Sequence, residues 1–400
     1  MIKELTVENT NLPAGWEMKT LGDISDFQRG LTYSGKDAVD FSENIVLRAT
    51  NIDLDKSCLD FSELKYLNND FQVKQNKKIV KGGLLICLSS GSKKHLGKVA
   101  LVTDDYNYAF GGFIGQIIPD NQVVSKYLFY NLVSESYKKY ISELTDGIGI
   151  NNLKSIDLKS FEIPLPPLSQ QKQIVTILDK AFAAIDTAKA NAEQNLQNAK
   201  ELFESYLQNV FSTKGDDWEE KTLENVCESI SAGGDKPKEL SKFKTEKFTI
   251  PIYANGEKNK GLYGFTNVAK VLEPSITISG RGTIGYSEIR NEPFTPIVRL
   301  IVLIPKKEKI DIKFLKYIVS NINFINSGSS IPQLTVPMVK GYKITYPSIK
   351  EQEKIVQKLD ALSAECEKLE AIYTQKIADL EEMKKSILQK AFSGQLYTIN

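Results

Sequence analysis

Histidine is almost absent from this chain of 400 residues, which contains one, His95. A single histidine argues against histidine-based metal sites and against duplicated histidine-dependent catalytic triads. Cysteine is scarce too, and its four residues are scattered without metal-ligand spacing or a disulfide framework: Cys58, Cys87, Cys227 and Cys366. We therefore expect no metal site, and we interpret the cysteines as small, buried or half-buried side chains.

Long apolar segments and nucleotide-binding motifs are also missing. No apolar run approaches about 18 residues, and the N-terminus lacks a basic-then-apolar signal, so we expect a cytoplasmic protein without a membrane segment. There is no GxxxxGK(S/T) phosphate loop, no Asn-Pro-Pro-aromatic or Asp-Pro-Pro-aromatic methylation motif, and no convincing dinucleotide-binding turn. We assign no catalytic residue and expect a chain that is not itself an enzyme.

Net charge is nearly zero, at +1 from 51 basic and 50 acidic residues. That balance argues against a simple basic protein that coats DNA. The charge is uneven, however: residues 1–165 carry 19 basic and 21 acidic side chains, whereas residues 217–347 carry 19 and 14. Any nucleic-acid face must therefore be local, or be completed by a partner.

One long stretch, residues 169–212, is present twice. It aligns without a gap with residues 350–393, at the constant offset of 181 residues that separates Gln171 from Gln352. Both copies lack proline and internal glycine, and apolar residues recur at steps of three and four, which predicts long helices that pair as a coiled coil. The seams include Ile174, Leu178 and Ile185 in the first copy, and Leu359, Leu362 and Leu369 in the second. The alternative is two ordinary core helices.

The repeat extends beyond the helices. Trp16-Glu17 is echoed by Trp218-Glu219, and Leu153 before the first helix is echoed by Leu334 before the second. The sequence therefore predicts a duplication of one unit, a globular domain followed by a long helix. The predicted globular domains are residues 1–165 and 213–347, and the predicted helices are residues 166–212 and 348–400. The linker after the first helix is too short to return along a rod of about 65 Å. We therefore expect the helices to run antiparallel, with a pseudo-two-fold repeat.

Each globular part has the pattern of an α+β domain. In the first, residues 43–49, 83–88, 98–103 and 113–118 are rich in β-branched and aliphatic side chains and are predicted strands. Residues 125–144 have helical periodicity and are predicted to form one helix. The predicted fold is thus two α+β domains separated by two long helices.

Polar loops at matching places are the candidate nucleic-acid contacts. Glycine lets the backbone approach a ligand, lysine and arginine reach phosphates or guanine, and asparagine and glutamine pair with adenine. The same residues also suit solvated turns, so both interpretations remain open. The candidates in the first domain are Ser90, Ser92, Lys93, Lys94, His95, Asn151 and Asn152; those in the second are Asn255, Lys258, Lys260, Ser279, Arg281, Thr283 and Gln333.

The plan as a whole resembles the DNA-specificity subunit of type I restriction–modification systems. The residues that carry the resemblance are Trp16-Glu17 with Leu21 at the start of a domain, and the run Ile163-Pro164-Leu165-Pro166-Pro167-Leu168 entering the first long helix. The second copy has Thr345-Tyr346-Pro347-Ser348-Ile349 instead, which departs from that run. The resemblance covers essentially the whole chain.

The resemblance implies a function. Each globular part would be a target-recognition domain that reads one half of a split, non-palindromic double-stranded DNA sequence. The helices would fix the spacer and dock two methyltransferase subunits, which bind S-adenosylmethionine and methylate adenine. The seam residues named above would then be the docking residues, and this chain would bind no cofactor. Whether ATP-dependent restriction and translocation subunits join stays open. The alternative is a coiled-coil scaffold that bridges protein partners without reading DNA.

Overall fold

The computed structural model describes residues 12–145, 152–213, 215, 217–324 and 333–397. The chain divides into two compact units, one made of Met1–Asn191 with Lys376–Asn400 and the other of Ala192–Gln375. Each unit therefore holds one globular domain and a part of both long helices.

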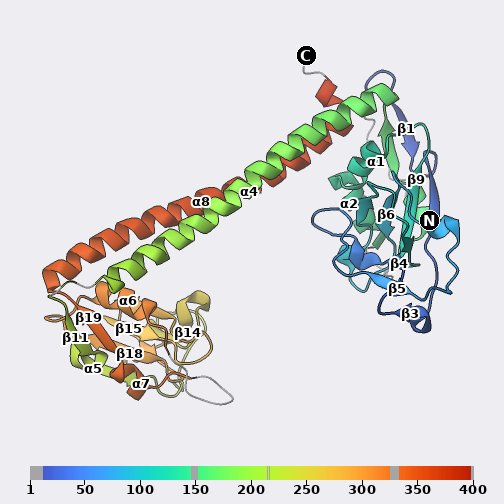
Figure 1. Cartoon of the computed structure of the whole chain (residues 1–400). Helices are drawn as coiled ribbons and strands as arrows, with labels where there is room; N and C mark the ends of the chain where they lie inside the picture. The colour runs from blue at the N-terminus through green and yellow to red at the C-terminus, as the bar shows by residue number, and fades with distance from the viewer. Residues whose placement is uncertain (1–11, 146–151, 214, 216, 325–332, 398–400) are drawn as a thin grey trace. The chain divides into compact units, whose positions relative to one another are not determined.

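The first domain is built on three small sheets (Figure 1). An antiparallel pair joins β1 (Glu17–Thr20) to β10 (Glu162–Leu165). A four-stranded antiparallel sheet has the order β2 (Ser25–Arg29), β9 (Ile114–Pro119), β6 (Leu84–Cys87) and β7 (Val99–Leu101). The other has the order β3 (Ala38–Val39), β5 (Lys65–Leu67), β4 (Asn44–Leu47) and β8 (Ala109–Phe110). All four predicted strand positions are confirmed, as β4, β6, β7 and β9.

The helices of the first domain are α1 (Ser125–Leu132), α2 (Glu135–Thr145) and α3 (Ser155–Lys159). The prediction of a single helix over residues 125–144 is wrong, because one helix ends at Leu132 and a second begins at Glu135. Ser134 provides the reason: its hydroxyl donates to the carbonyl of Asn131 at 2.6 Å and accepts from the backbone N–H of Tyr137 at 3.3 Å. A serine that bonds the backbone this way ends one helix and begins the next.

The second domain repeats the strand order of the paired strands and of the four-stranded sheet, and its third sheet has one strand fewer. Its paired strands are β11 (Glu219–Thr222) and β19 (Lys343–Tyr346). Its four-stranded sheet has the order β12 (Cys227–Ala232), β18 (Ile301–Pro305), β15 (Ser275–Ile278) and β16 (Ser287–Arg290). The third sheet has the order β14 (Leu262–Thr266), β13 (Ile250–Tyr253) and β17 (Thr295–Pro296). The helices are α5 (Leu223–Val226), α6 (Ile312–Asn321) and α7 (Val336–Gly341).

The core of each domain lies between its four-stranded sheet and the neighbouring helix. All four residues of β6 are buried and apolar, as expected of a central strand covered on both faces. All four residues of β15 are buried as well, although Ser275 and Thr277 are polar. Tyr127 of α1 and Phe314 of α6 are both fully buried in these cores. The Trp16 indole is also buried and donates to the side chain of Gln170 at 2.9 Å.

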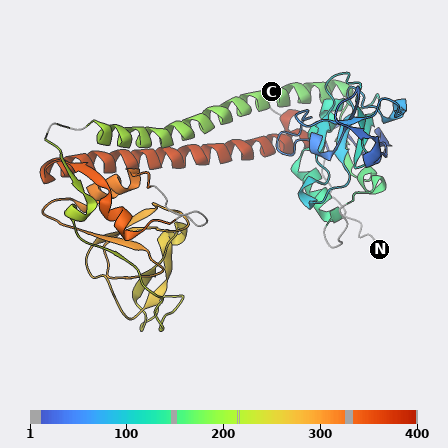
Figure 2. The ribbon, with the colours of Figure 1, turned by 60° about the horizontal axis from the view of Figure 1, so that its bottom comes forward.

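The two long helices are α4 (Leu168–Ser212) and α8 (Ile349–Phe392), and they lie side by side (Figures 1 and 2). In the first unit, Lys189 pairs with Glu381 at 2.6 Å and Asp186 pairs with Lys384 at 2.9 Å. The partner number rises as the α4 number falls, so the helices are antiparallel. The predicted antiparallel coiled coil is confirmed.

Each domain is fastened to its own long helix by the same set of bonds. The side chain of Gln171 accepts from the N–H of Val124 and donates to the carbonyls of Gln122 and Pro166. Gln352 makes the matching bonds to Asp311, Lys309 and Pro347.

A carboxylate two turns further along each helix makes a second attachment. Asp179 receives Lys126 at 2.8 Å and the hydroxyl of Tyr130. Asp360 receives Lys313 and Tyr317, each at 2.6 Å. These repeated contacts show that the duplication extends to single side chains.

Candidate nucleic-acid interface

Three separate segments meet at one edge of the first domain. The N–H groups of Leu88 and Ser89 both donate to the carbonyl of Phe113, at 2.9 and 3.2 Å, and the N–H of Leu153 donates to the carbonyl of Leu88 at 2.7 Å. Ser89 also forms an isolated bridge with Asn152. We call Ser89, Phe113 and Asn152 the first corner.

The three equivalent segments of the second domain also meet. The N–H of Leu334 donates to the carbonyl of Gly280 at 2.8 Å, and the guanidinium of Arg281 donates to the side-chain oxygen of Gln333 at 3.1 Å. Arg281, Gln333 and Arg299 together line a hollow of 160 Å³. We call Arg281, Arg299 and Gln333 the second corner.

Matching backbone bonds establish that Phe113 and Arg299 are equivalent. Each stands in a turn that leads from the third sheet into the four-stranded sheet. In the first domain the turn closes with a bond from Ile114 to Gly111, and in the second with one from Leu300 to Ile297.

Glycines allow these turns to pack closely on the neighbouring strand. A side chain at Gly30 would overlap the Gly111 carbonyl, and a Cβ at Gly233 would lie 2.6 Å from the carbonyl carbon of Pro296. Both positions therefore require glycine, since backbone atoms cannot move aside as a flexible side chain can.

The turn of the second corner has a strained backbone. Val298 and Arg299 have φ angles of 53° and 62°, a region that β-branched residues in particular avoid. Three bonds hold it: the N–H groups of Val298 and Arg299 donate to Gly234 and Gly233, and the Asn255 amide donates to the Val298 carbonyl at 2.6 Å. Strain that persists under several restraints is common at binding sites.

The predicted contacts of the first domain gather on the loop after β6, around η4 (Lys93–His95). Ser92 and Lys94 are exposed, while Ser90 and His95 are half-buried. Lys93 donates to the carbonyl of Thr145 at 2.9 Å, so its ammonium group ties this loop to the end of α2. Asn152 is exposed in the first corner, and Asn151 lies outside the described residues.

In the second domain, two of the predicted contacts organise the loops. Asn255 accepts from the N–H of Gly280 at 2.8 Å, in addition to its bond to Val298, and the buried hydroxyl of Ser279 accepts from Gly256 at 2.9 Å. Arg281 and Gln333 lie in the second corner, and Thr283 is exposed beside it. These five residues come from three separate loops of the sequence, and the structure brings the loops together.

Lys258 and Lys260 are exposed on η5 (Lys258–Gly261), which packs on the segment that carries Asn255. The N–H of Ala254 donates to the carbonyl of Gly261 at 2.9 Å. Arg290, only 6% exposed, stacks 3.6 Å above the ring of Tyr253 and donates to the carbonyl of Lys260 at 2.5 Å. Burial lowers the pKa of Arg290 from its ordinary value. Through its bond to the Lys260 carbonyl, the buried Arg290 side chain holds the loop that carries Lys258 and Lys260 in place.

Phe113 and Arg299 were missed at the sequence level. The segment Ile297-Val298-Arg299-Leu300 looks like part of one strand, so the turn inside it is hidden. Phe113 gave no signal of a binding site, because a single Phe before a strand is common. Phe113 is 69% exposed and Arg299 is also exposed.

The predicted docking residues lie inside the chain's own helix packing. Ile174, Leu178, Ile185 and Leu359 are buried, and Leu362 and Leu369 are half-buried. Their role in docking stays a prediction, but a partner cannot touch the buried ones directly. The exposed large apolar side chains of the helices are instead Leu168, Ile177, Leu202, Ile372 and Met383.

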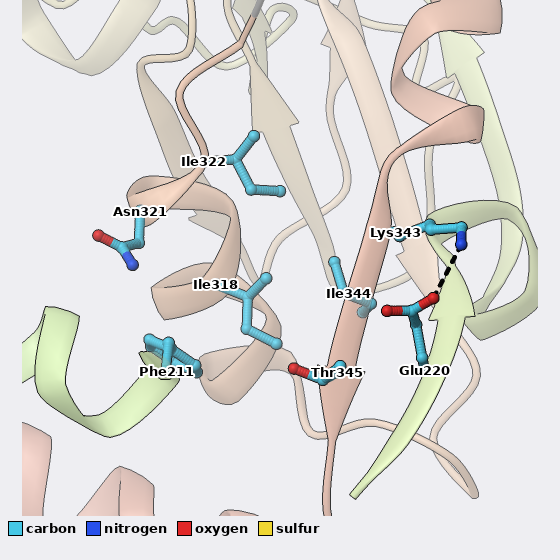
Figure 3. Close-up of a pocket in the computed structure, with 8 residues that line it drawn as sticks. All are labelled: Phe211, Glu220, Ile318, Asn321, Ile322, Lys343, Ile344 and Thr345. Atoms are coloured by element: carbon cyan, nitrogen blue, oxygen red, sulfur yellow. Dashed lines mark hydrogen bonds and ion pairs between the residues drawn. The ribbon is translucent and has the colours of Figure 1, made fainter. Parts of the chain in front are cut away.

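A second hollow, of 190 Å³, lies beside the end of α4 in the second unit (Figure 3). Phe211, Ile318 and Ile344 contribute apolar surface, and Lys343 pairs with Glu220 at 2.9 Å at its side.

Within the described ranges, no group of three or more His, Cys, Asp or Glu residues could hold a metal ion. The helices among those residues include none long and apolar enough to cross a membrane.

The fold and the corners define a class: a duplicated α+β chain with an antiparallel helix pair and one polar loop cluster in each domain. The chain matches the model of the type I restriction modification DNA specificity domain twice, over residues 13–198 and 215–381. It therefore belongs to the family of type I restriction–modification specificity subunits, as its sequence suggested.

Characterised relatives agree along nearly the whole chain. It is 26% identical to the type I restriction enzyme StySPI specificity subunit of Salmonella potsdam, over 96% of this chain and 90% of that protein. It is also 26% identical to the EcoKI specificity subunit of Escherichia coli, with the same coverage.

Solved structures share the fold. A chain from a study of assembly and conformational transition of the type I restriction–modification system superposes with a TM-score of 0.80 at 19% identity, covering 95% of this chain and 98% of that one. The HsdS subunit from Thermoanaerobacter tengcongensis gives 0.63 at 20% identity, covering 96% and 98%.

Proposed function

We propose that this chain is the non-catalytic subunit that reads a bipartite, non-palindromic DNA target and positions methyltransferase subunits for adenine methylation, or restriction subunits for cleavage. One observation carries the proposal: the two domains present equivalent corners with different side chains. Equivalent geometry suits the same task performed twice, and different chemistry suits two different half-sites.

The charge distribution supports local rather than overall DNA attraction. The second domain is the more basic of the two, and its Arg281, Arg299, Lys258 and Lys260 all belong to one loop cluster. Phosphate contacts supply much of the affinity of most DNA-binding proteins. A chain with net charge +1 therefore suits a complex in which partner subunits supply part of those contacts.

The partners fit the duplicated helices. Two copies of one methyltransferase subunit would bind this chain, one on each repeat, through equivalent surfaces. S-adenosylmethionine would be bound by the methyltransferase subunits rather than by this chain. ATP-dependent restriction and translocation subunits would join the same complex in the cytoplasm.

The exposed helix residues allow a docking test. Leu202 is 50% exposed, and Met383, its equivalent in the repeat, is 52% exposed. Leu202→Asp with Met383→Asp should weaken binding of the methyltransferase subunits in gel filtration while the chain stays folded. Glu204→Ala with Lys385→Ala, the next polar pair at the same offset, is the matched control. Leu178 and Ile185 do not allow such a test, because charging them would disrupt the core of the first unit. Unchanged assembly of the aspartate variant would contradict docking at these positions.

The proposed function as a whole is tested by single-molecule methylation sequencing of the host genome with and without this gene. Loss of adenine methylation at one split, non-palindromic motif is the expected result. In parallel, the purified chain with its methyltransferase subunits should methylate mixed DNA at that same motif. A complex that assembles and methylates no specific sequence would overturn the proposal in favour of a scaffold that bridges proteins.

A further inference from the structure

The two corners differ in chemistry at two of their three positions, Ser89 against Arg281 and Phe113 against Arg299, and this difference carries an inference that rests on the proposed function. Ser89 corresponds to Arg281, because each follows the residue whose carbonyl accepts from Leu153 or Leu334. Asn152 corresponds to Gln333 at the constant offset of the repeat. Phe113 corresponds to Arg299 through the matching turns.

The second corner is suited to guanine. Arg281 and Arg299 both line one hollow, and the described residues that line it include no carboxylate. Guanine presents two acceptors, O6 and N7, in the major groove, and the planar fork of arginine matches both. Arg281 is already oriented by its bond to Gln333 at 3.1 Å. Arg299 is exposed on a turn whose backbone is fixed by three hydrogen bonds.

The first corner is suited to an A·T pair. Its side chains carry no charge: an asparagine carboxamide, a serine hydroxyl and a phenyl ring that is 69% exposed. A carboxamide pairs with N6 and N7 of adenine, and an apolar group contacts the methyl group of thymine. The backbone that carries Phe113 is fixed, because its carbonyl accepts from the N–H groups of both Leu88 and Ser89.

We propose that the two corners read base edges and set different preferences: the second corner, through Arg299 and Arg281, selects a G·C pair, and the first, through Phe113 and Asn152, selects an A·T pair. The two half-sites would differ because the same geometric position holds arginine in one domain and phenylalanine in the other.

The arginine arm of the test uses Arg299→Lys. Lysine keeps the positive charge for a phosphate contact but loses the paired donors that match guanine. The reconstituted complex, acting on DNA with each motif position randomised, should lose discrimination at one G·C pair by on the order of 5- to 150-fold. The other half-site should keep its preferences. An equal loss for every sequence, or no loss at all, would overturn the assignment of Arg299.

The phenylalanine arm uses Phe113→Ala, with Phe41→Ala as the matched control. Phe41 is 81% exposed and lies against Tyr66, away from the segments that form the first corner. Phe113→Ala should relax one A·T pair in the half-site that Arg299→Lys leaves intact, whereas Phe41→Ala should change no position. If both phenylalanine variants behaved alike, Phe113 would have no part in base reading.

The proposed function and the assignment of the two corners can be disproved separately. If the wild-type complex methylates no split motif, the proposed function is wrong. If it methylates such a motif and the variants preserve every base preference, only the corner assignment is wrong. Circular dichroism and subunit assembly of each variant exclude loss of folding as the cause of a negative result.

Discussion

At the scale of single residues, the backbone at Val298 has an energetic consequence. A left-handed conformation costs an ordinary residue roughly 1–2 kcal/mol, and Val298 has φ 53°. Asparagine tolerates this conformation, so Val298→Asn should raise the free energy of unfolding by about 1 kcal/mol. A higher midpoint in thermal unfolding checks it.

The control is Val268→Asn, which changes another exposed valine, 56% accessible, whose φ is not positive. It should give no gain. Equal behaviour of the two variants would show that the turn stores no strain.

The residues of the candidate site were only partly predictable from the sequence. Arg281 and Gln333 were found because polar loops with glycine stand at matching places in the repeat. Phe113 and Arg299 were missed, because their importance depends on contacts between segments far apart in the chain. The DNA contact of Asn255 stays a prediction, and the sequence did not reveal that its amide bonds to Val298 and Gly280.

At the scale of elements, the carboxylate of Asp360 links α8 to α6. Burial alone would raise the pKa of Asp360, but hydrogen bonds from Lys313 and Tyr317 outweigh burial and lower it from the ordinary value of 3.8. A lowered pKa means that the ionised form stabilises the fold above the ordinary value and that this contribution is lost as pH falls through the folded value. Asp360→Asn should therefore destabilise the second unit at neutral pH by about 1 kcal/mol or less, since the pair is partly exposed.

The measurement is the unfolding free energy of wild type and variant across pH. The difference should be constant from about pH 5 to 8 and shrink below about pH 4. Asp235→Asn, which changes an exposed carboxylate of the same unit, should show neither effect. A difference that persists undiminished in acid would assign the loss to packing rather than to charge.

Elements with a strong local pattern were predicted well from the sequence. Both long helices and the four strands that were predicted in the first domain follow from periodicity and composition over short windows. The break between α1 and α2 was not predicted, because Ser134 is compatible with a helix interior and ends the helix only through its bonds to Asn131 and Tyr137. A hydrogen bond between a side chain and the backbone does not change the spacing of the apolar residues, so the helical periodicity does not reveal it.

At the scale of the whole molecule, the duplication was readable because insertions fall in loops and leave the helices in register. Gln171 with Gln352 and Asp179 with Asp360 share the offset of 181 residues, whereas Glu17 of β1 and Glu219 of β11 are offset by 202. Attachments to a long helix tolerate no slippage, since one added residue turns every following side chain by about 100°. The helix pair is therefore the part of the chain whose length can be changed predictably.

Under the proposed function, that length sets the spacer between half-sites. Adding seven residues to both helices, after Asn191 and after Gln375, preserves the heptad seam and lengthens the pair by about 10 Å. With 3.4 Å per base pair, the preferred spacer should grow by about three base pairs. Three base pairs also rotate the second half-site by about a third of a turn, so methylation should weaken even at the new optimum.

The experiment measures methylation of DNA in which the spacer varies and both half-sites stay fixed. The control adds seven residues to α4 alone, which leaves the antiparallel helices unequal in length and should abolish activity on every spacer. A doubly extended chain that keeps the wild-type spacer would mean that the helices do not measure the distance. The spacing would then be set by the partner subunits, and the helix pair would serve only as their docking surface.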